Sequence, residues 1–233
     1  MPTASFSTVH CVVFDIDDTL YLERDYVKSG FEALAPLVRE RFGAIGFADR
    51  AFAAFERGIR GTTFDVALAE CGVAASPHEI AELVAAYRAH RPKIALATDA
   101  ARCLADLHGR LPVAVVSDGP LVAQQNKTAA LGLAEWCDPI LLTEALGAGL
   151  GKPHPAAFEM VERAAGTRGE QCLYVADNPA KDFQAPRALG WRTLRIRRPL
   201  SLHYATAEPL FWDAELANLD KLAELLNLGK RGV

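Results

Sequence analysis

The sequence has no long apolar run and no concentration of positive charge, and these two absences exclude broad classes of function. None of its apolar stretches approaches the ~20 residues that a helix needs to span a membrane. The formal net charge is −4, and the Lys and Arg residues are dispersed along the 233 residues. A nucleic-acid or anionic-membrane surface needs clustered basic residues. We therefore expect neither a nucleic acid nor a membrane as a partner.

The sequence also lacks the cysteine patterns of disulfide frameworks and zinc sites. Its five cysteines are odd in number, and none of them stands in a CxxC pair. The first ten residues, MPTASFSTVH, lack the basic and apolar segments of a secretory signal. We therefore expect reduced cysteines and a cytoplasmic location.

The composition is that of an ordinary globular protein, with 51% hydrophobic and 23% charged residues. A chain of this length can form one sizeable domain, or a domain with a smaller one inserted. Five short apolar segments rich in β-branched residues predict strands at 11–14, 111–117, 139–143, 172–176 and 191–196. Helical patterns lie between and after them at 99–107, 121–131, 155–165, 180–189 and 218–228. This alternation predicts an α/β fold with a Rossmann-like, doubly wound parallel sheet.

The segment between the first two strands has a different character. From about residue 24 to residue 90 it is rich in Ala, with apolar residues at helical spacing, as in Phe31, Leu34, Leu37, Val38 and Phe42. Ser76-Pro77 followed by Glu79 is a helix start with a capping box. The pattern predicts an all-helical domain at 22–93, inserted into a core domain made of 1–21 and 94–233.

Three predicted strands end in polar residues. Asp15 and Asp17 follow the first strand, Ser117-Asp118-Gly119 ends the second, and Asp177-Asn178 follows the fourth. In open parallel sheets, ligands bind beyond the carboxyl ends of the strands. Asp15 and Asp17 share a face if the extended backbone persists, and crowded carboxylates favour a divalent cation.

Four short motifs, in this order, resemble those of the haloacid dehalogenase superfamily of phosphotransferases and hydrolases, and the resemblance covers nearly the whole chain. DIDDT at 15–19 is similar to its first motif, and Ser117 at the end of an apolar strand is similar to the second. Lys152 in GKPHP is similar to the third, and Asp177 with Asp182 in ADNPAKD is similar to the fourth. The helical insertion resembles the helical cap of the family's first type.

The resemblance implies a role for each of these residues. Asp15 is the expected nucleophile, which forms an aspartyl-phosphate, and Asp17 is the expected general acid and base. Mg²⁺ is the implied cofactor, held by Asp15, the backbone carbonyl of Asp17 and Asp177. Lys152 is expected to pair with both the nucleophile and the phosphate.

The remaining motif residues are expected to support this chemistry. Ser117 and the amides of Asp118 and Gly119 would bind phosphoryl oxygens. Asp182 would act indirectly or through a water molecule, with Asn178 nearby and Thr19 fixing the loop. In the cap, Arg24 and Lys93 are the residues expected to face the substrate. The basic run from Arg192 to Arg198 is read as protection of an edge strand.

The resemblance implies a Mg²⁺-dependent phosphatase that acts on a small phosphorylated metabolite of the phosphosugar, phosphoglycolate or nucleotide monophosphate class, as a monomer or homodimer. A phosphomutase, a 2-haloacid dehalogenase and a non-catalytic binding protein on the same fold are the alternatives. Dehalogenases typically lack an acid two residues after the nucleophile, so Asp17 argues against that reaction.

Overall fold

The computed structural model describes residues 6–206 and 212–229, so short parts of the predicted core domain lie outside the described residues. The chain divides into two compact units. The first consists of residues 1–23 and 95–233, and the second of residues 24–94. The sequence-based boundaries were placed at residues 21/22 and 93/94.

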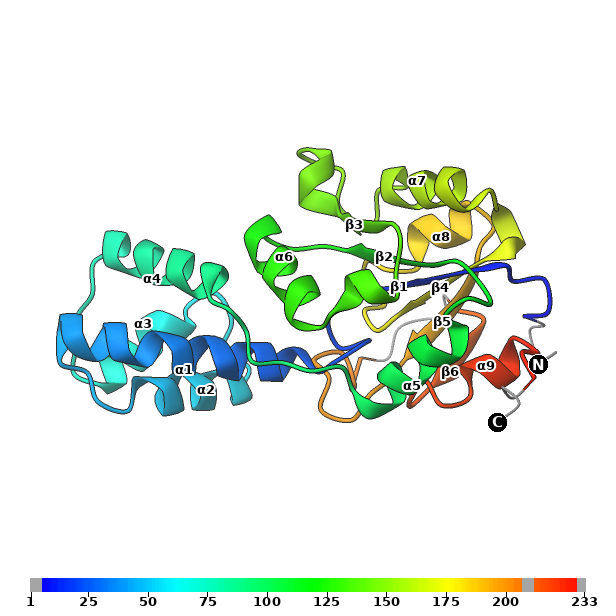
Figure 1. Ribbon diagram of the computed structural model, residues 1–233. Coiled ribbons are helices and arrows are strands. Elements are labelled where there is room, and N and C mark those ends of the chain that lie inside the picture. The colour runs from blue at the N-terminus through cyan, green and yellow to red at the C-terminus, as the bar shows by residue number, and fades with distance from the viewer. Residues whose placement is uncertain (1–5, 207–211, 230–233) are drawn as a thin grey trace. The chain divides into compact units, whose positions relative to one another are not determined.

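Within the described residues, the first unit contains a six-stranded sheet in the order β3-β2-β1-β4-β5-β6 (Figure 1). Every neighbouring pair is parallel. The strands are β1 (Cys11–Phe14), β2 (Val113–Ser117), β3 (Ile140–Leu142), β4 (Cys172–Ala176), β5 (Arg192–Ile196) and β6 (Ala214–Leu216). The five predicted strands are thus all present, and the α/β class with a Rossmann-like parallel sheet is confirmed.

The central strands β2, β1 and β4 are buried along their whole length. Their side chains are nearly all apolar because helices cover both faces of a parallel sheet. Val12 lies in register with Val113 on one side and Leu173 on the other, which fixes the alignment of the three strands. That alignment places the polar residues after β1, β2 and β4 at the same edge of the sheet.

Helices cover the sheet on both faces. Figure 1 shows α7 (Ala156–Ala165) and α8 (Gln184–Ala188) on one face and α5 (Thr98–Leu107) and α9 (Leu222–Leu225) on the other. The helix α6 (Leu121–Ala130) follows β2, and three short 3-10 segments, η1 (Leu133–Glu135), η2 (Thr143–Leu146) and η3 (Gly169–Gln171), complete the connections.

Three aromatic rings link α7 to the sheet. Phe158 contacts Tyr174 edge-to-face with ring centroids 5.0 Å apart, and it contacts Trp191 in the same way at 5.4 Å. Phe158 and Tyr174 have no exposed surface, and Trp191 has 3%. The Tyr174 hydroxyl also accepts a hydrogen bond from Lys152 at the polar edge of the sheet. The packing of these rings therefore supports the position of that edge.

The C-terminal part of the core differs from the prediction. The strand β6 was not expected, because three residues with the sequence AEL carry too little pattern to be recognised. The helix expected at 218–228 is reduced to α9, four residues long. The helix expected from residue 180 begins at Gln184, because Asn178 and the residues after it form a hydrogen-bonded turn instead.

The interpretation of the basic run as edge protection was wrong. The strand β5 pairs with β4 on one side and β6 on the other, so it is not an edge. Arg195 on this strand is 2% exposed. Its guanidinium donates to the carbonyl oxygens of Asp177 at 3.3 Å, His203 at 2.7 Å and Thr206 at 3.1 Å. Backbone carbonyls thus compensate a buried cation.

The second unit is helical, and residues 24–93, described throughout, contain no strand. Its helices are α1 (Glu23–Phe42), α2 (Phe47–Glu56), α3 (Thr63–Glu70) and α4 (Pro77–Ala89). The predicted capping box of α4 is present: the backbone amide of Glu79 donates to Ser76 Oγ, and the Ser76 amide donates to Glu79 Oε2. Leu37 is 41% exposed, so the apolar face of α1 is narrower than predicted.

Two further features are the character of the helices and the state of the cysteines. Among the helices of residues 6–206 and 212–229, none combines the length and the apolar character needed to cross a membrane. All five cysteines lie in the described residues, and each of them is a free thiol.

We expect Phe158→Ala to lower the free energy of unfolding by about 3–5 kcal/mol, because the substitution leaves a cavity between α7 and the sheet. Urea unfolding followed by circular dichroism measures this loss. Val122→Ala on α6 is the control: Val122 is 51% exposed, and its truncation should change the free energy by no more than about 0.5 kcal/mol. Equal losses in the two variants would contradict the assigned core.

Candidate active site

The carboxyl ends of β1, β2 and β4 meet at one edge of the sheet, as the sequence predicted. Asp15 follows β1, Ser117 ends β2, and Asp177 follows β4. The loop before α7 contributes Lys152, and the turn after β4 contributes Asp182. Residues separated by up to 167 positions in the sequence are thereby brought into one polar cluster in the first unit.

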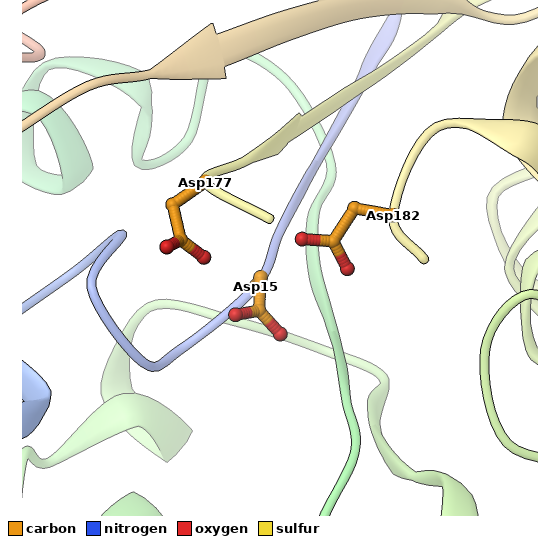
Figure 2. A group of neighbouring side chains, drawn as sticks. All are labelled: Asp15, Asp177 and Asp182. Carbon is orange, nitrogen blue, oxygen red and sulfur yellow. The ribbon is translucent and has the colours of Figure 1, made fainter. Parts of the chain in front are cut away.

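Three buried carboxylates form the centre of this cluster. Asp15, Asp177 and Asp182 each offer an oxygen atom, and these atoms lie within 4.8 Å of one another (Figure 2). Oδ2 of Asp177 is buried and has no hydrogen-bond partner among the described residues. Burial, followed by the charges of Asp182 and Asp15, raises the pKa of Asp177 to about 10. Three hard oxygen donors that repel one another fit a divalent cation such as Mg²⁺.

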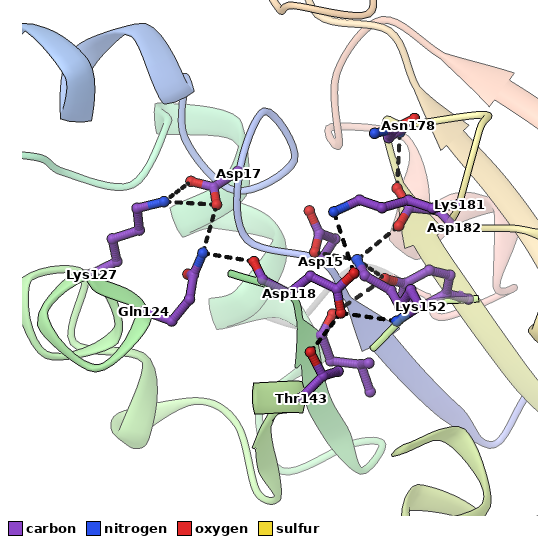
Figure 3. A network of polar contacts seen from close by, with 12 residues as sticks. Asp15, Asp17, Asp118, Gln124, Lys127, Thr143, Lys152, Asn178, Lys181 and Asp182 are labelled. Carbon is purple, nitrogen blue, oxygen red and sulfur yellow. Dashed lines mark hydrogen bonds and ion pairs between the residues drawn. The ribbon is translucent and has the colours of Figure 1, made fainter. Parts of the chain in front are cut away.

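Asp15 is buried in the site, with 6% of its surface exposed. Burial raises its pKa to about 6, and the charge of Lys152 opposes that increase. The ammonium group of Lys152 lies 2.7 Å from Asp15 Oδ1, as the sequence analysis expected for the nucleophile's partner. The same group lies 2.7 Å from Asp182 Oδ1 and donates to the Tyr174 hydroxyl at 2.9 Å (Figure 3).

The neighbouring carboxylates also keep Lys152 charged. Burial on its own lowers the pKa of a lysine, but Asp15 and Asp182 outweigh it and hold the pKa of Lys152 well above its usual value. Asp182, expected to act indirectly or through a water molecule, is completely buried and lies in the acidic cluster, and its role stays a prediction.

Asp17 has a separate set of partners. The ammonium group of Lys127 on α6 lies 2.7 Å from Asp17 Oδ1 and 2.8 Å from Oδ2. Gln124 Nε2 donates to Oδ2 at 3.0 Å, and the Tyr21 hydroxyl donates to Oδ1. Burial raises the pKa of Asp17, but Lys127 and these hydrogen bonds more than offset it, so the pKa lies below its usual value.

The backbone explains why the two acids of the first motif have different partners. The strand ends at Phe14, and Asp18 has a left-handed backbone with φ of 53°. The condition under which Asp15 and Asp17 would share a face, an extended backbone through both residues, is therefore not met. The loop gives each carboxylate its own lysine, Lys152 for Asp15 and Lys127 for Asp17.

Lys127 and Gln124 were not identified from the sequence. They stand three residues apart on α6, so both side chains lie on the same face of the helix (Figure 3). Two long polar residues on a buried helical face beside a polar strand end are the signal that could have identified them. Gly119 makes room for this arrangement: its φ is 135°, and a Cβ atom there would lie 2.6 Å from Gln124 Nε2.

Ser117 at the end of β2 and Asp118 directly after it differ in their side-chain contacts. Asp118 Oδ1 accepts hydrogen bonds from Thr143 Oγ1 at 2.6 Å and from the Lys152 amide at 3.0 Å. This carboxylate therefore links the segments that carry residues 118, 143 and 152. Ser117 is 1% exposed, and its Oγ has no hydrogen-bond partner among the residues described. A buried hydroxyl of this kind can donate to an oxygen atom of a ligand.

The loop that carries the two acids is held in place by buried polar contacts. Asp18 accepts hydrogen bonds from the amides of Glu23 at 2.9 Å and Leu202 at 2.7 Å. Thr19 is completely buried, and its carbonyl oxygen accepts from Arg198 Nε at 2.9 Å. Asp18 thus supports the loop. Thr19 Oγ1 has no hydrogen-bond partner among the described residues, so a role of this side chain in fixing the loop stays a prediction.

Asn178 arranges the acidic end of β4. Its amide donates to Asp182 Oδ2 at 2.9 Å, and its side-chain oxygen accepts from the Ala180 amide at 3.0 Å. The resulting turn returns the chain to the site, which brings Asp182 beside Lys152.

Arg24 and Lys93 belong to the second unit and have contacts within it. Arg24 lies 3.2 Å from Glu56 and over the ring of Phe52. The Lys93 amide donates to Ser29 Oγ at 2.8 Å, and its side chain is exposed. Their role toward a substrate stays a prediction.

We expect Asp177→Asn to stabilise the metal-free protein. Because the pKa of Asp177 is raised from 3.8 to about 10, the stability that this carboxyl contributes is present below about pH 4 and is lost as pH rises toward 10. In EDTA, the variant's Tm should therefore exceed that of the wild type at about pH 8, with a smaller difference at about pH 5.

Mg²⁺ should raise the Tm of the wild type and leave that of Asp177→Asn unchanged. Thermal unfolding at the two pH values, with Mg²⁺ or EDTA, measures both effects. The exposed Asp106→Asn on α5 is the control and should behave as the wild type does. If the Tm of Asp177→Asn in EDTA at the higher pH were below that of the wild type, the repulsion of Asp177 by Asp15 and Asp182 would be contradicted.

Comparisons with known proteins agree with this architecture. The glyceraldehyde 3-phosphate phosphatase of Methanocaldococcus jannaschii is 28% identical over 196 residues, which cover 79% of this chain and 83% of that protein. The hydrolase YfnB of Bacillus subtilis, solved with bound magnesium, superposes with a TM-score of 0.68 at 20% identity, covering 94% of this chain and 99% of that one. A 2-haloacid dehalogenase of Pseudomonas syringae gives 0.64 at 23% identity, covering 94% and 98%.

The two solved structures show the fold that this chain shares with them, and the fold by itself does not assign an activity. A family model described as haloacid dehalogenase-like hydrolase matches residues 9–190, a span that contains every residue of the polar cluster described above. The chain therefore belongs to the haloacid dehalogenase-like hydrolases.

Proposed function

We propose that this hydrolase is a Mg²⁺-dependent phosphatase that releases phosphate from a small phosphorylated metabolite through an aspartyl-phosphate on Asp15. The observation that carries the proposal is the buried group of Asp15, Asp177 and Asp182 around Lys152, with Asp17 two residues after Asp15. The likeness to a glyceraldehyde 3-phosphate phosphatase supports a small phosphosugar as the substrate class. Phosphoglycolate and nucleotide monophosphates belong in the same test.

In the first step, an oxygen of Asp15 attacks phosphorus and the bond from phosphorus to the leaving oxygen breaks. Asp17, whose pKa is lowered by Lys127 in the free site, must take up a proton before this step; it gives that proton to the leaving oxygen, and the alcohol departs. In the second step, water attacks the phosphorus of the aspartyl-phosphate while Asp17 takes a proton from it. This step releases inorganic phosphate and restores the Asp15 carboxylate.

The surrounding residues bind and orient the reacting groups. Asp15 and Asp177, with the backbone carbonyl of Asp17 as the predicted third ligand and Asp182 beside them, would hold Mg²⁺. Bound Mg²⁺ supplies positive charge that offsets the repulsion between the carboxylates and a phosphate dianion. The buried Ser117 hydroxyl and the amides of Asp118 and Gly119 would donate to phosphoryl oxygens.

The alternatives differ in what they require of Asp17. A 2-haloacid dehalogenase has no leaving alkoxide to protonate, so the three groups that hold Asp17 would have no function in that reaction. A phosphomutase uses the same pair of acids, and the phosphoryl group of its aspartyl-phosphate passes to a second sugar phosphate instead of to water. Phosphate release distinguishes hydrolysis from both alternatives.

The first experiment measures phosphate release from a panel of small phosphoesters by the wild type and by Asp15→Asn, each with Mg²⁺ and with EDTA. We expect release by the wild type with Mg²⁺ alone, and a loss of at least about 10³-fold in Asp15→Asn, because the nucleophile is removed. Circular dichroism should show that the variant is folded. Undiminished release by Asp15→Asn, or by the wild type in EDTA, would contradict the mechanism.

We expect Lys127→Met to lower kcat by at least about tenfold, because Asp17 loses the charge that fixes its position. Steady-state kinetics on the best ester of the panel measure the loss, and Lys127→Arg should recover part of it. Gln125→Ala is the control, since Gln125 lies on the same helix and is exposed. A kcat of Lys127→Met equal to that of the control would show that Lys127 has no role in positioning Asp17.

A further inference from the structure

Gln124 on α6 contacts two parts of the active site with a single amino group. Its Nε2 donates to Asp17 Oδ2 at 3.0 Å and to the backbone carbonyl of Asp118 at 2.8 Å, and Figure 3 shows the side chain lying between these two residues. Both N–H donors of the side-chain amide are thereby used. The amide therefore joins the proposed general acid to the residues whose backbone amides would bind the phosphate.

The surroundings of this side chain determine its orientation. Gln124 is 2% exposed, and its Oε1 is buried with no hydrogen-bond partner among the described residues. If the amide were turned over, Oε1 would lie against the Asp17 carboxylate and a carbonyl oxygen, and acceptors repel one another. A buried acceptor without a partner is unfavourable. The two donated hydrogen bonds are therefore made at the expense of the acceptor.

Gly119 provides the space that the Gln124 amide occupies. Its φ is 135°, and a Cβ atom there would lie 2.6 Å from Gln124 Nε2 and 3.4 Å from Cδ. A residue with a side chain at position 119 would push the amide away from its two acceptors. The peptide units at 118 and 119, which would bind phosphoryl oxygens, are thus packed directly against the side chain that holds Asp17.

Lys127 holds the same carboxylate in a different way. Its ammonium group lies 2.7 Å from Asp17 Oδ1 and 2.8 Å from Oδ2, and such an ion pair needs the ionised carboxylate. In the proposed mechanism Asp17 carries a proton when it meets the leaving oxygen. A neutral amide donates to a carboxyl oxygen in either form. Gln124 can therefore keep Asp17 in place in both steps of the reaction.

We infer that Gln124 is a positioning residue that aligns Asp17 with the leaving oxygen of the substrate, by tying the general acid to the residues that bind the phosphate. The inference rests on the proposed phosphatase function and deepens it, since it assigns the alignment of the proton donor to a buried residue of α6. The leaving oxygen must lie within hydrogen-bond reach of Asp17 for the proton to pass. A misplacement of about 1 Å can cost on the order of 10²-fold in rate.

The test compares esters whose leaving groups differ in acidity. The constant kcat/KM reports the first transfer, in which the leaving oxygen departs, and an acidic phenol such as that of p-nitrophenyl phosphate departs without a proton. We expect Gln124→Met to lower kcat/KM at least about tenfold for the best alkyl ester of the panel, but no more than about threefold for p-nitrophenyl phosphate. A loss of packing alone would lower both constants by the same factor.

Two further variants accompany this measurement. Gln125→Met is the matched control, because Gln125 is the neighbouring residue on α6 and is exposed, and it should leave both constants unchanged. Gln124→Glu keeps the size of the side chain and places an oxygen atom where the amino group stood. It should show the same selective loss, and it serves as the test if Gln124→Met does not fold. Circular dichroism shows which variants are folded.

The outcomes for the inference and for the proposed function differ. A selective loss for the alkyl ester in a folded Gln124 variant would support the positioning role. Equal losses for the two esters, or no loss for either, would overturn the inference and leave the phosphatase in place. If the wild type released phosphate from neither ester, the proposed function would fail and the inference with it, since no leaving group would be protonated.

Discussion

The ion pair of Lys152 with Asp15 and Asp182 is the interaction on which the polar edge of the sheet depends. A single ammonium group, completely buried, connects the end of β1 with the turn after β4 through two contacts of 2.7 Å. Three carboxylates could not be buried together without it, because each unpaired charge carries a large desolvation cost. The site therefore has a fixed centre, and its excess negative charge would favour the binding of a divalent cation.

Around this centre, separate lysines serve separate acids. Lys127 holds Asp17 by two contacts, and Lys181 lies near Asp118. Among the described residues of the cluster, no lysine forms an ion pair with both Asp15 and Asp17. The separation has a chemical consequence. In the proposed mechanism Asp15 is an ionised nucleophile and Asp17 exchanges a proton, and distinct partners would allow one group to change its contacts without disturbing the other.

The rest of the first unit keeps these loops in position. Asp18, Asp118 and Asn178 direct their side chains to backbone amides, and Arg195 and Arg198 direct theirs to backbone carbonyls. Such contacts fix loops that have little apolar surface to bury. A fold shared with a 2-haloacid dehalogenase does not decide the activity, and the proposed function rests on side chains at the strand ends, Asp17 among them.

The sequence by itself determined the strands β1 to β5, the parallel sheet, the helical insertion and the gathering of Asp15, Ser117, Lys152, Asp177 and Asp182. Each of these follows from local periodicity or from a short motif at a strand end, and such signals are read over a few residues. The pairing of Lys152 with Asp15 was expected from the motifs, whereas the cations beside Asp17 and Asp118 are visible only in the tertiary structure. Two of the partners of Asp17, Gln124 and Lys127, lie on a helix more than 100 residues away, and the buried Arg195 lies on a strand that pairs with the short strand β6. Contacts of this kind leave no periodic trace, because a polar side chain on a helix or loop has the same local pattern whether it faces solvent or a buried carboxylate.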